Sequence, residues 1–400
     1  MGILVQKFGG TSVASVEKMK EVCNIIENYR KKGNDLVIVV SAMGRKGDPY
    51  ATDTLINLCT NVNQKPKKRE LDLIMSCGEV ISGTILSSML EGRGIPSVFL
   101  TGTQAGIITT KIYSNSKIKE INPTRIQREL DEGKVVVIAG FQGGTEDGEV
   151  TTLGRGGSDT SAVAIGKALG CETVQIYTDV DGIMTADPRI EPSAKILDYC
   201  DYEEVFQMAE KGAKVIHPRA VELAKNGDIV LEIKNTLNPS CKGTRIGLTR
   251  DAGGSYEDFQ SRFMTSVAHK DNIAQVKVKS SEALFSKILN EMEEKHINLD
   301  MINFFTEEKA FALDQNNNLV EEILKKNNVE YEVRKHCAKV TLIGTKITET
   351  PGVIARVVRA LSKAGITLLQ SSDSYTCLTC LVKEEDMIDT VHAIHKEFAE

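Results

Sequence analysis

The sequence predicts an α/β protein in which a three-layer αβα domain is followed by two ferredoxin-like modules. Its 400 residues exceed what one hydrophobic core normally supports, so more than one domain is expected. Over about the first 235 residues, short β-branched apolar runs alternate with helical periods, which is typical of a three-layer α/β domain. A glycine-rich polar stretch at 243–262 then indicates a linker, and an internal repeat follows it.

The first domain, predicted at 1–245, contains apolar runs without the alternation of a half-exposed strand. Such near-continuous runs suit strands that are covered on both faces of a sheet. They lie at residues 36–40, 97–100, 135–139 and 174–177. Amphipathic helices are predicted between them, for instance at 16–32 and 71–90. The linker is predicted at 246–262.

The internal repeat predicts two βαββα modules, at 263–335 and 336–400, which together make a ferredoxin-like pair. The first unit reads as strand 274–279, helix 282–295, strand 297–302, strand 310–313 and helix 319–326. The second reads as strand 338–343, helix 353–363, strand 366–370, strand 377–382 and helix 385–398. Residues 264–268 and 331–334 are additional strands. We hypothesise that one of them completes the second module's sheet, so that the two modules are interleaved.

The composition excludes several classes of protein. A net charge of −6 without a basic run indicates neither a nucleic-acid footprint nor a membrane surface. No apolar run approaches the roughly 20 residues of a membrane span, and the N-terminus reads as a core strand, not a signal sequence. Nine scattered cysteines suit free thiols in a reducing cytoplasm.

Two constellations of potential metal ligands fail on geometry. Cys377 and Cys380 are three apart on a predicted strand and point to opposite faces. His392 and His395 can share a helical face but have no third ligand in the sequence nearby. Both pairs are interpreted as structural, and no protein-ligated metal site is expected.

The first candidate site is a glycine pair behind the N-terminal strand. Gly9 and Gly10 let the backbone approach an anion closely, and Lys7 adds a positive charge at the same point. Thr11 or Ser12 can cap the helix that follows. Lys-x-Gly-Gly alone is better explained as an ordinary strand-to-helix turn with an exposed lysine. The phosphate-binding interpretation gains weight from a second glycine cluster downstream.

That second cluster surrounds Arg155. Gly154, Gly156 and Gly157 form an anion-accepting turn, and Ser158 and Asp159 open the next helix. The planar guanidinium of Arg155 suits a carboxylate or phosphate, and Asp159 can orient a lysine or serve a metal. A plain loop is the alternative, and we favour the functional interpretation.

A third segment, 178–189, places acids, a glycine and a Pro-Arg turn after a strand, where ligands collect in open α/β sheets. A calcium loop is rejected because its later ligands are missing. Ser41 also follows a strand, while Glu79 and Lys214 are ambiguous taken alone. The sequence contains neither a Walker phosphate loop nor a dinucleotide fingerprint, and it suggests no Ser-His-Asp or Cys-His arrangement.

Taken together, the motifs at 7–12, 154–159, 178–182 and 185–189 resemble those of the aspartokinases, a branch of the amino acid kinase superfamily. The tail resembles the paired ACT modules of that family, so the resemblance covers nearly the whole chain. Residues 39–53 resemble in particular the diaminopimelate-sensitive aspartokinases of spore-forming bacteria. The resemblance implies ATP-dependent phosphorylation of the β-carboxyl of L-aspartate, the first step toward lysine, threonine, methionine and diaminopimelate.

The resemblance also implies roles for single residues. ATP would be held by Lys7, Phe8, Gly9, Gly10, Ser41, Thr178, Asp179, Ile183, Met184, Asp187, Pro188, Arg189 and Lys214. Aspartate would be held by Thr52, Glu79, Arg155, Gly156, Gly157 and Ser158. The catalytic residues would be Lys7, Asp159 and Lys214, with Asp159 organising the two lysines and Mg²⁺ carried by ATP.

These roles agree with the chemistry of a carboxylate nucleophile. With a reference pKa of about 3.9 it is already ionised at neutral pH, so no general base is required. The reaction needs in-line positioning of two anions and stabilisation of the charge on the moving phosphoryl group. Lys7, Lys214, the Gly9 and Gly10 amides and Mg²⁺ would supply that stabilisation. Arg155 would grip the α-carboxylate of aspartate, and Glu79 its α-ammonium.

In the tail, Pro351, Gly352, Val353 and Ile354 match the loop where ACT modules commonly start a helix and bind an amino acid. The corresponding residues 279–282 lack Pro-Gly, which leaves open which module or interface binds diaminopimelate, lysine or threonine. The ACT modules also imply a homo-oligomer. The alternatives are another kinase of the superfamily, acting on glutamate, acetylglutamate or a nucleoside monophosphate, and a silent amino-acid-binding regulator.

Overall fold

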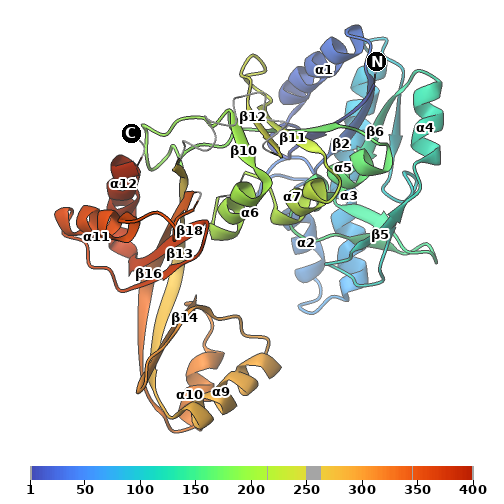
Figure 1. The fold of residues 1–400 in the computed structure, drawn as a ribbon. Helices are drawn as coiled ribbons and strands as arrows, with labels where there is room; N and C mark the ends of the chain where they lie inside the picture. The colour runs from blue at the N-terminus through green and yellow to red at the C-terminus, as the bar shows by residue number, and fades with distance from the viewer. Residues whose placement is uncertain (1, 214, 249–262, 345, 399–400) are drawn as a thin grey trace. The chain divides into compact units, whose positions relative to one another are not determined.

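The structure, a computed structural model, describes residues 2–213, 215–248, 263–344 and 346–398. These residues form two compact units (Figure 1). The first comprises the described parts of Met1–Ile183, Ile196–Ala209 and Lys214–Tyr256. The second comprises the described parts of Met184–Lys195, Glu210–Ala213 and Glu257–Glu400. Residues 249–262, most of the predicted linker, lie outside the described residues, and residues 246–247 belong to a strand instead.

The first unit is built on an eight-stranded sheet with a parallel centre. Its strands, in spatial order, are β10 (Tyr199–Asp201), β12 (Thr244–Gly247), β11 (Val230–Asn235), β9 (Thr173–Thr178), β1 (Ile3–Phe8), β2 (Asp35–Val40), β6 (Val135–Ala139) and β3 (Ser97–Leu100). From β11 to β3 all neighbours are parallel, and β11 pairs antiparallel with β12. The four strands predicted from apolar runs are confirmed. The carboxyl ends of β9, β1 and β2 lie side by side, which brings their loops together.

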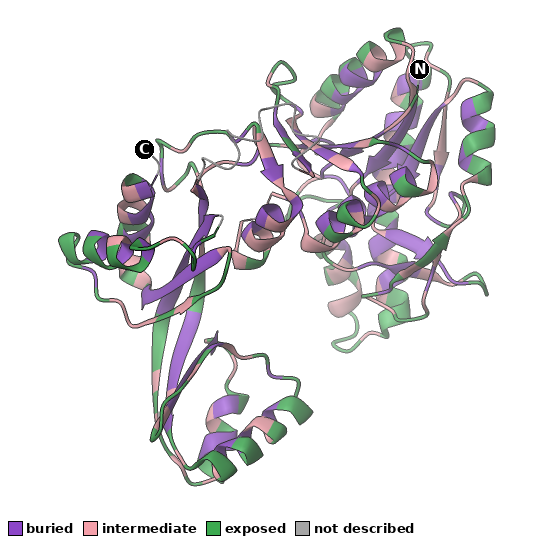
Figure 2. Ribbon diagram, viewed as in Figure 1, coloured by how far each residue is buried: buried purple, intermediate pink, exposed green. Residues whose placement is uncertain are grey.

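Helices cover both faces of this sheet, so the predicted three-layer αβα architecture is confirmed. Side chains of α1 (Val16–Lys31) and α3 (Lys68–Glu91) share one core with the sheet, including Phe8, Ile38 and Leu86. The opposite face of β1, β2 and β9 contacts α5 (Gly157–Ala168), which in turn packs on α7 (Pro218–Lys225). The remaining helices among the described residues of this unit are α2 (Thr52–Thr60), α4 (Thr124–Asp131) and α6 (Tyr202–Lys211). Figure 2 shows the central strands buried and the outer helix faces exposed.

A small second sheet lies at one end of α3. Its strands, in spatial order, are β5 (Ile118–Ile121), β4 (Ile107–Thr109), β7 (Gln142–Gly144) and β8 (Val150–Thr152). β8 contacts α3 and leads directly into the loop that carries Arg155. The sequence does not reveal this sheet, because all four of its strands are only three or four residues long and β7 consists of polar residues and glycine alone.

By length and composition alone, α3 could cross a membrane, since an 18-residue window has a mean hydropathy of 1.5. The helix contains Asp72 and Glu79, so it is not a continuous apolar run. Half of that window is buried within the protein, and α3 packs on β3, β6 and β8. These contacts are those of a core helix in a folded domain.

The second unit contains one six-stranded antiparallel sheet. Its strands, in spatial order, are β14 (Asp300–Phe304), β15 (Glu308–Asp314), β13 (Met264–Lys279), β16 (Glu330–Gly344), β18 (Cys377–Lys383) and β17 (Gln370–Asp373). Its helices are α9 (Glu282–Glu294), α10 (Leu319–Lys326), α11 (Val353–Lys363) and α12 (Met387–Phe398), with a 3₁₀ turn at Glu384–Asp386. β14 and β17 begin three to four residues later than the predicted strands at 297–302 and 366–370.

The two modules share their central strands, which confirms the hypothesised interleaving. The first part of β13 pairs with the last part of β16, from Met264 opposite Gly344 to Lys270 opposite Lys339. The last part of β13 pairs with the first part of β16, where Lys279 lies opposite Glu330. Residues 264–268 and 274–279 are thus one strand, as are 331–334 and 338–343. The predicted module boundary at 335–336 falls inside β16, and the first module is inserted between two parts of the second.

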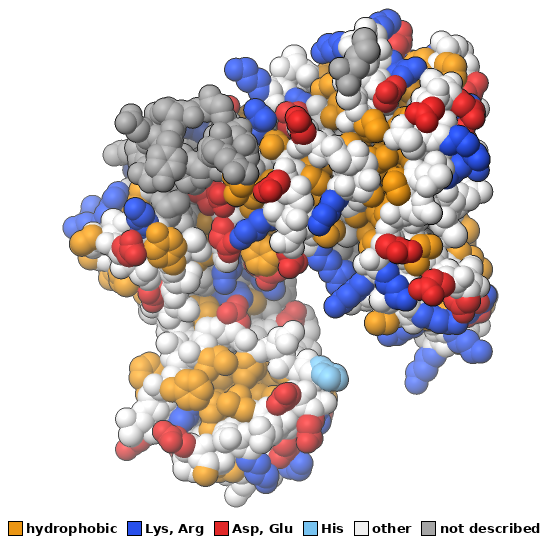
Figure 3. Space-filling model, turned by 45° about the vertical axis from the view of Figure 1, so that its right-hand side comes forward, with side chains coloured by type: hydrophobic (Ala, Val, Ile, Leu, Met, Phe, Trp, Pro, Cys, Tyr) orange, Lys and Arg blue, Asp and Glu red, His pale blue; other side chains and the backbone are white. Residues whose placement is uncertain are grey.

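Each module has its own hydrophobic core. α9 and α10 pack on the first module's half of the sheet around Phe285 and Phe311, and α11 and α12 pack on the other half around Val357 and Ile394. The first module also exposes large apolar side chains, visible as a hydrophobic surface in Figure 3. Those on or beside the edge strand β14 are Ile302, Phe304 and Phe305, which are 40%, 62% and 59% exposed.

Candidate active site

A cavity of about 640 Å³ opens at the carboxyl ends of β1 and β2 in the first unit. Its size is within the range of small-molecule sites. It brings together residues that the sequence predicted separately, namely Lys7, Gly10, Ser41, Thr52, Glu79, Arg155, Gly156, Gly157, Ser158 and Asp159. They come from five separate segments of the chain, spread over more than 150 positions.

Lys7 and Asp159 form the charged centre of this cavity. The Lys7 Nζ lies 2.6 Å from Asp159 Oδ1, and each side chain is 11% exposed. Lys7 stands near the end of β1, where it lies opposite Val39 of β2 and Ile176 of β9. Asp159 is in the first turn of α5. Burial strengthens this attraction and holds the ammonium at one point of the cavity wall.

The glycine pair differs from its prediction in one respect. A Cβ on Gly10 would lie 2.8 Å from the Gly44 carbonyl oxygen and 2.9 Å from that of Ala42, so only glycine fits there. The Gly9 amide, however, donates to the Tyr177 carbonyl at 3.1 Å and adds one rung to the β1–β9 ladder. The expectation that the Gly9 amide points to a phosphate is therefore wrong in this structure. Gly10, which lines the cavity, keeps its predicted place.

Glu79 is a buried carboxyl group aimed at the cavity from α3. Its Oε1 accepts a hydrogen bond from the Ala42 amide at 2.9 Å, and its residue is 2% exposed. The buried Oε2 has no hydrogen-bond partner among the described residues. Burial raises the pKa of Glu79 to about 8, although the donated amide partly opposes the shift. A cation entering the cavity would satisfy the unpartnered oxygen.

Arg155 is carried by a turn that needs glycine on both sides. Gly154 and Gly156 have φ of 78° and 68°, in the left-handed region. A Cβ on Gly156 would lie 2.1 Å from the His217 ring, so this position has no room for a side chain. Arg155 is exposed at the cavity wall and, within the part of the chain that the structure describes, makes no ion pair. Its guanidinium is thus available to an anionic ligand.

The remaining predicted nucleotide residues do not line this cavity. Asp179 forms an ion pair with Arg45, Nη2 to Oδ2 at 2.5 Å, and accepts a hydrogen bond from Thr178. Phe8 stacks on Tyr177 in the core, and the buried Ile183 amide donates to Thr244. Met184, Asp187, Pro188 and Arg189 belong to the second unit, where Arg189 forms an ion pair with Asp187. Lys214 lies outside the described residues.

Sequence reasoning missed several residues of the cavity wall. Besides Ala42 and Gly44, they are Asp53, Ile56, Leu71, Met75, Ser114, Phe141 and Thr152. Asp53 adjoins Thr52 in a quoted motif and could have been found there. Ser114 and Phe141 have φ of 69° and 66°, conformations that only tertiary contacts select in non-glycine residues. No local pattern in the sequence announces them.

Comparisons with known proteins agree with this fold and site. Residues 2–235 match the amino acid kinase family, and residues 332–396 match the ACT domain. Aspartokinase 1 of Bacillus subtilis is 40% identical over 402 residues, covering 100% of this chain and 99% of that protein. Aspartokinase of Geobacillus stearothermophilus is 39% identical over 411 residues, covering 100% and 97%.

Solved structures share the fold over the whole chain. Escherichia coli aspartokinase III in complex with aspartate and ADP has a TM-score of 0.81 at 23% identity, covering 100% of both chains. Clostridium acetobutylicum aspartate kinase has a TM-score of 0.81 at 23% identity, covering 99% of this chain and 100% of that one. The three-layer domain and its cavity thus define an amino acid kinase. Within that class, the chain belongs to the aspartokinase family, as the motifs predicted.

Proposed function

We propose that this protein transfers the γ-phosphoryl group of ATP to the β-carboxylate of L-aspartate, giving 4-phospho-L-aspartate. The observation that carries the proposal is the single cavity in which the Lys7–Asp159 pair, Arg155 and the buried Glu79 meet. One cation beside a glycine turn suits a phosphoryl group, while an arginine and a carboxyl group suit the two charged groups of an amino acid. The full-length aspartokinase relatives support the same reaction.

The residues divide the chemical work between them. Lys7 would neutralise charge on the phosphoryl group as it moves, with Asp159 holding the ammonium in place. Arg155 would bind the α-carboxylate of aspartate, and Glu79 would accept its α-ammonium. Lys214 and the residues at 178–189 remain proposed nucleotide ligands. Because the aspartate carboxylate is already ionised at neutral pH, the step needs positioning and charge stabilisation but no base.

Mg²⁺ would be carried by the nucleotide phosphates. Among the described residues there is no group of three or more His, Cys, Asp or Glu side chains placed to hold a metal ion. When bound, Mg²⁺ would supply positive charge beside the transferring phosphoryl group. On the protein side, Lys7 would complete that neutralisation.

An assay of ADP release separates this proposal from its neighbours. The enzyme is offered ATP with aspartate, glutamate, acetylglutamate or UMP, and turnover is expected with aspartate. Higher kcat/KM for any other acceptor would overturn the proposed substrate. Binding of lysine or diaminopimelate without any turnover would instead support a silent regulator.

We also propose that an amino acid of the same biosynthetic route inhibits the enzyme through its ACT modules. The α11 helix starts after Gly352, which has φ of 88° and offers no side-chain cap, whereas α9 is capped by Ser281. The uncapped N-terminus, with Pro351, Val353 and Ile354 around it, would receive an effector carboxylate. Activity titrated with diaminopimelate, lysine and threonine, singly and in pairs, tests this proposal, and insensitivity to all three would refute it.

The proposed assembly is a homo-oligomer formed through the ACT modules. Its support is the edge strand β14, which exposes Ile302 and Phe304 beside Phe305 on the apolar surface of the first module (Figure 3). An unpaired edge with exposed aromatic side chains is suited to a second copy of the chain. Sedimentation of the wild-type protein and of Phe304→Asp tests the assembly.

All nine cysteines are free thiols, which supports the proposed cytoplasmic location.

A further inference from the structure

Asp72 is a fully buried carboxylate that the proposed reaction does not use. It stands on α3, two turns before Glu79, and is 0% exposed. Its Oδ2 accepts hydrogen bonds from the backbone amides of Ser114 and Thr152 at 2.9 and 2.8 Å. Its Oδ1 accepts hydrogen bonds from the hydroxyl groups of the same two residues at 3.1 and 3.0 Å. Four donors thus fill the lone-pair sites of this carboxylate.

The two residues that Asp72 holds belong to the wall of the active-site cavity. Ser114 and Thr152 both line it, and Thr152 ends β8, three residues before Arg155. Ser114 has a left-handed backbone, which is unfavourable for any residue with a Cβ and therefore needs support from its surroundings. Asp72 gives that support by accepting hydrogen bonds from the amide and the hydroxyl group of Ser114.

A second charged side chain holds the same stretch from the opposite helix. Arg219, in the first turn of α7, donates to the Leu153 carbonyl at 2.9 Å and to Asn115 Oδ1 at 2.7 Å. Leu153 follows Thr152, and Asn115 follows Ser114. The side chains of Asp72 and Arg219 therefore form hydrogen bonds to adjacent residues in each of the same two segments. The Asn115 Oδ1 would in turn lie 3.1 Å from a Cβ at Gly154. These hydrogen bonds therefore fix the chain up to Leu153, two residues before Arg155.

Such fixation matters because the turn beyond it is rich in glycine. Gly154, Gly156 and Gly157 leave the backbone around Arg155 with more conformational freedom than other residues would. A bidentate grip on a carboxylate requires the guanidinium in one orientation, and orienting it at the moment of binding would lower the affinity. A rigid anchor immediately before the turn removes part of that cost.

We propose that Asp72 is a positioning residue for aspartate binding, which acts by holding Thr152 and Ser114 so that Arg155 meets the substrate carboxylate. Arg219 is its counterpart on the other side of the loop. This inference rests on the proposed role of Arg155.

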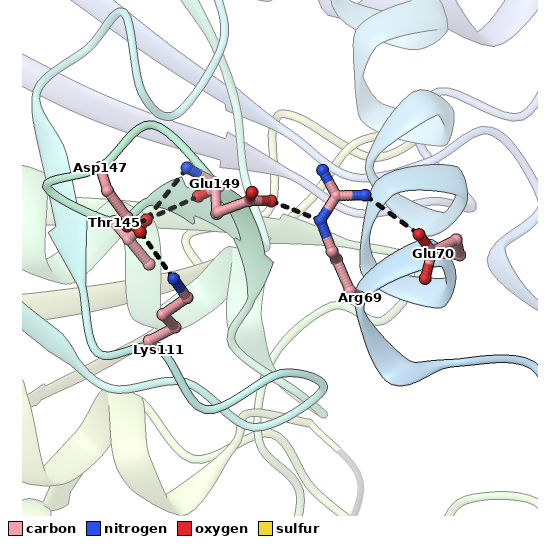
Figure 4. Close-up of polar contacts among 6 residues, drawn as sticks. All are labelled: Arg69, Glu70, Lys111, Thr145, Asp147 and Glu149. Carbon is pink, nitrogen blue, oxygen red and sulfur yellow. Dashed lines mark hydrogen bonds and ion pairs between the residues drawn. The ribbon is translucent and has the colours of Figure 1, made fainter.

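The alternative is that Asp72 only joins α3 to the small sheet. That joint is also made at the surface, where Arg69 of α3 pairs with Glu149 at 2.7 Å, beside the Lys111–Asp147 pair at 2.6 Å (Figure 4). Arg69 also contacts Glu70 in the same view. These exposed pairs touch only the outer end of the hairpin before β8. Asp72 contacts the two residues that line the cavity, and this difference is what an experiment can resolve.

The test compares Asp72→Ala and Asp72→Asn with Glu129→Ala in the full chain, by steady-state kinetics and thermal unfolding. Glu129 is a matched control, since it is a buried carboxylate of the same unit, is paired with Lys134 and Arg125, and lies outside the cavity wall. Both alanine variants are expected to lower Tm. Asp72→Ala is expected to raise the KM for aspartate about tenfold, because two buried amides lose their acceptor, with the KM for ATP changing less than about twofold.

Asp72→Asn is expected to rescue substrate binding to within about threefold of wild type. Its Oδ1 can accept from the two amides while its Nδ2 donates to the two hydroxyl oxygens, so that all four contacts survive. If Asp72→Ala does not fold, Arg219→Gln takes its place, with a rise of about threefold in the KM for aspartate and little change in that for ATP.

Arg155→Ala separates the failure of this inference from that of the proposed function. An unchanged KM for aspartate in Arg155→Ala would overturn the proposed role of Arg155 and this inference with it. A raised KM in Arg155→Ala beside a KM in Asp72→Ala equal to that of Glu129→Ala would overturn this inference alone. A parallel rise in both KM values of Asp72→Ala would assign Asp72 a merely structural role.

Discussion

The raised pKa of the buried Glu79 carboxyl group predicts that aspartate binding releases a proton. Burial raises the pKa of this carboxyl group from 4.5 to about 8, so about nine-tenths of the free protein carries the proton at pH 7. Pairing with the substrate α-ammonium requires the carboxylate. The apparent Kd for aspartate should therefore fall almost tenfold between about pH 6 and 7 and level off above about pH 8.

Calorimetry in two buffers of different ionisation enthalpy measures the proton directly. At pH 7 aspartate binding should release about 0.9 of a proton, and in Glu79→Gln it should release none.

The same raised pKa has a consequence for stability. The folded protein binds this proton more tightly than the unfolded chain does, so the contribution of Glu79 is fully present below about pH 4.5 and is lost as the pH rises through about 8.

The magnitude follows from the size of the shift. About 3.5 pH units correspond to about 5 kcal/mol, or about 1.4 kcal/mol for each unit within that window. Without substrate, Glu79→Gln should accordingly become more stable than the wild type as the pH rises, while its KM for aspartate increases. Urea unfolding of both proteins at several pH values tests this. Parallel pH dependences of the two unfolding free energies would refute the reasoning.

The remaining predictions concern the phosphoryl end of the cavity. Lys7→Ala should lower kcat by about 10²–10³ and raise the KM for aspartate far less, because Lys7 acts on the moving phosphoryl group; a kcat near that of wild type would contradict its role. Gly10→Ala should destabilise the protein by about 1–3 kcal/mol, since its Cβ would collide with two carbonyl oxygens. Gly9→Ala, whose Cβ would meet its neighbours at 3.5 Å, should change the free energy of unfolding by less than about 0.5 kcal/mol, and an equal loss in both would exclude a steric cause. Removal of Mg²⁺ with EDTA should abolish ADP release, and excess Mg²⁺ should restore it.

The sequence predicted the architecture well where side chains dictate it. The runs at 36–40, 97–100, 135–139 and 174–177 are nearly continuous in apolar residues, which suits strands of a sheet covered on both faces, and all four occur as strands. The glycines around Arg155, and Gly10 in the pair after Lys7, are required by the local backbone, so they can be recognised in the sequence. They correctly indicated residues that line the cavity. The helices at 319–326 and 353–363 were predicted with their observed bounds.

What the sequence could not reveal depends on contacts between distant segments. Nothing local says that the Gly9 amide bonds to Tyr177, or that 264–268 and 274–279 continue as one strand through a bulge. The burial that sets the pKa of Glu79 is likewise a property of the folded environment, since its helix reads as amphipathic. Asp72 had no motif, and its importance is visible only through the two segments that it joins.

The nesting of one ACT module within the other limits how the chain can be divided. Because Lys270 and Lys339 are direct neighbours across β13 and β16, residues 271–338 begin and end at the same rung of the ladder. A short hairpin turn could bridge that rung, and the second module would keep all its strands without the first. The reverse excision is impossible with a single cut, since the second module lies on both sides of the first. The first module, which is the inner one, can thus be gained, lost or exchanged as a unit. The second module cannot, because its sequence is split by the first.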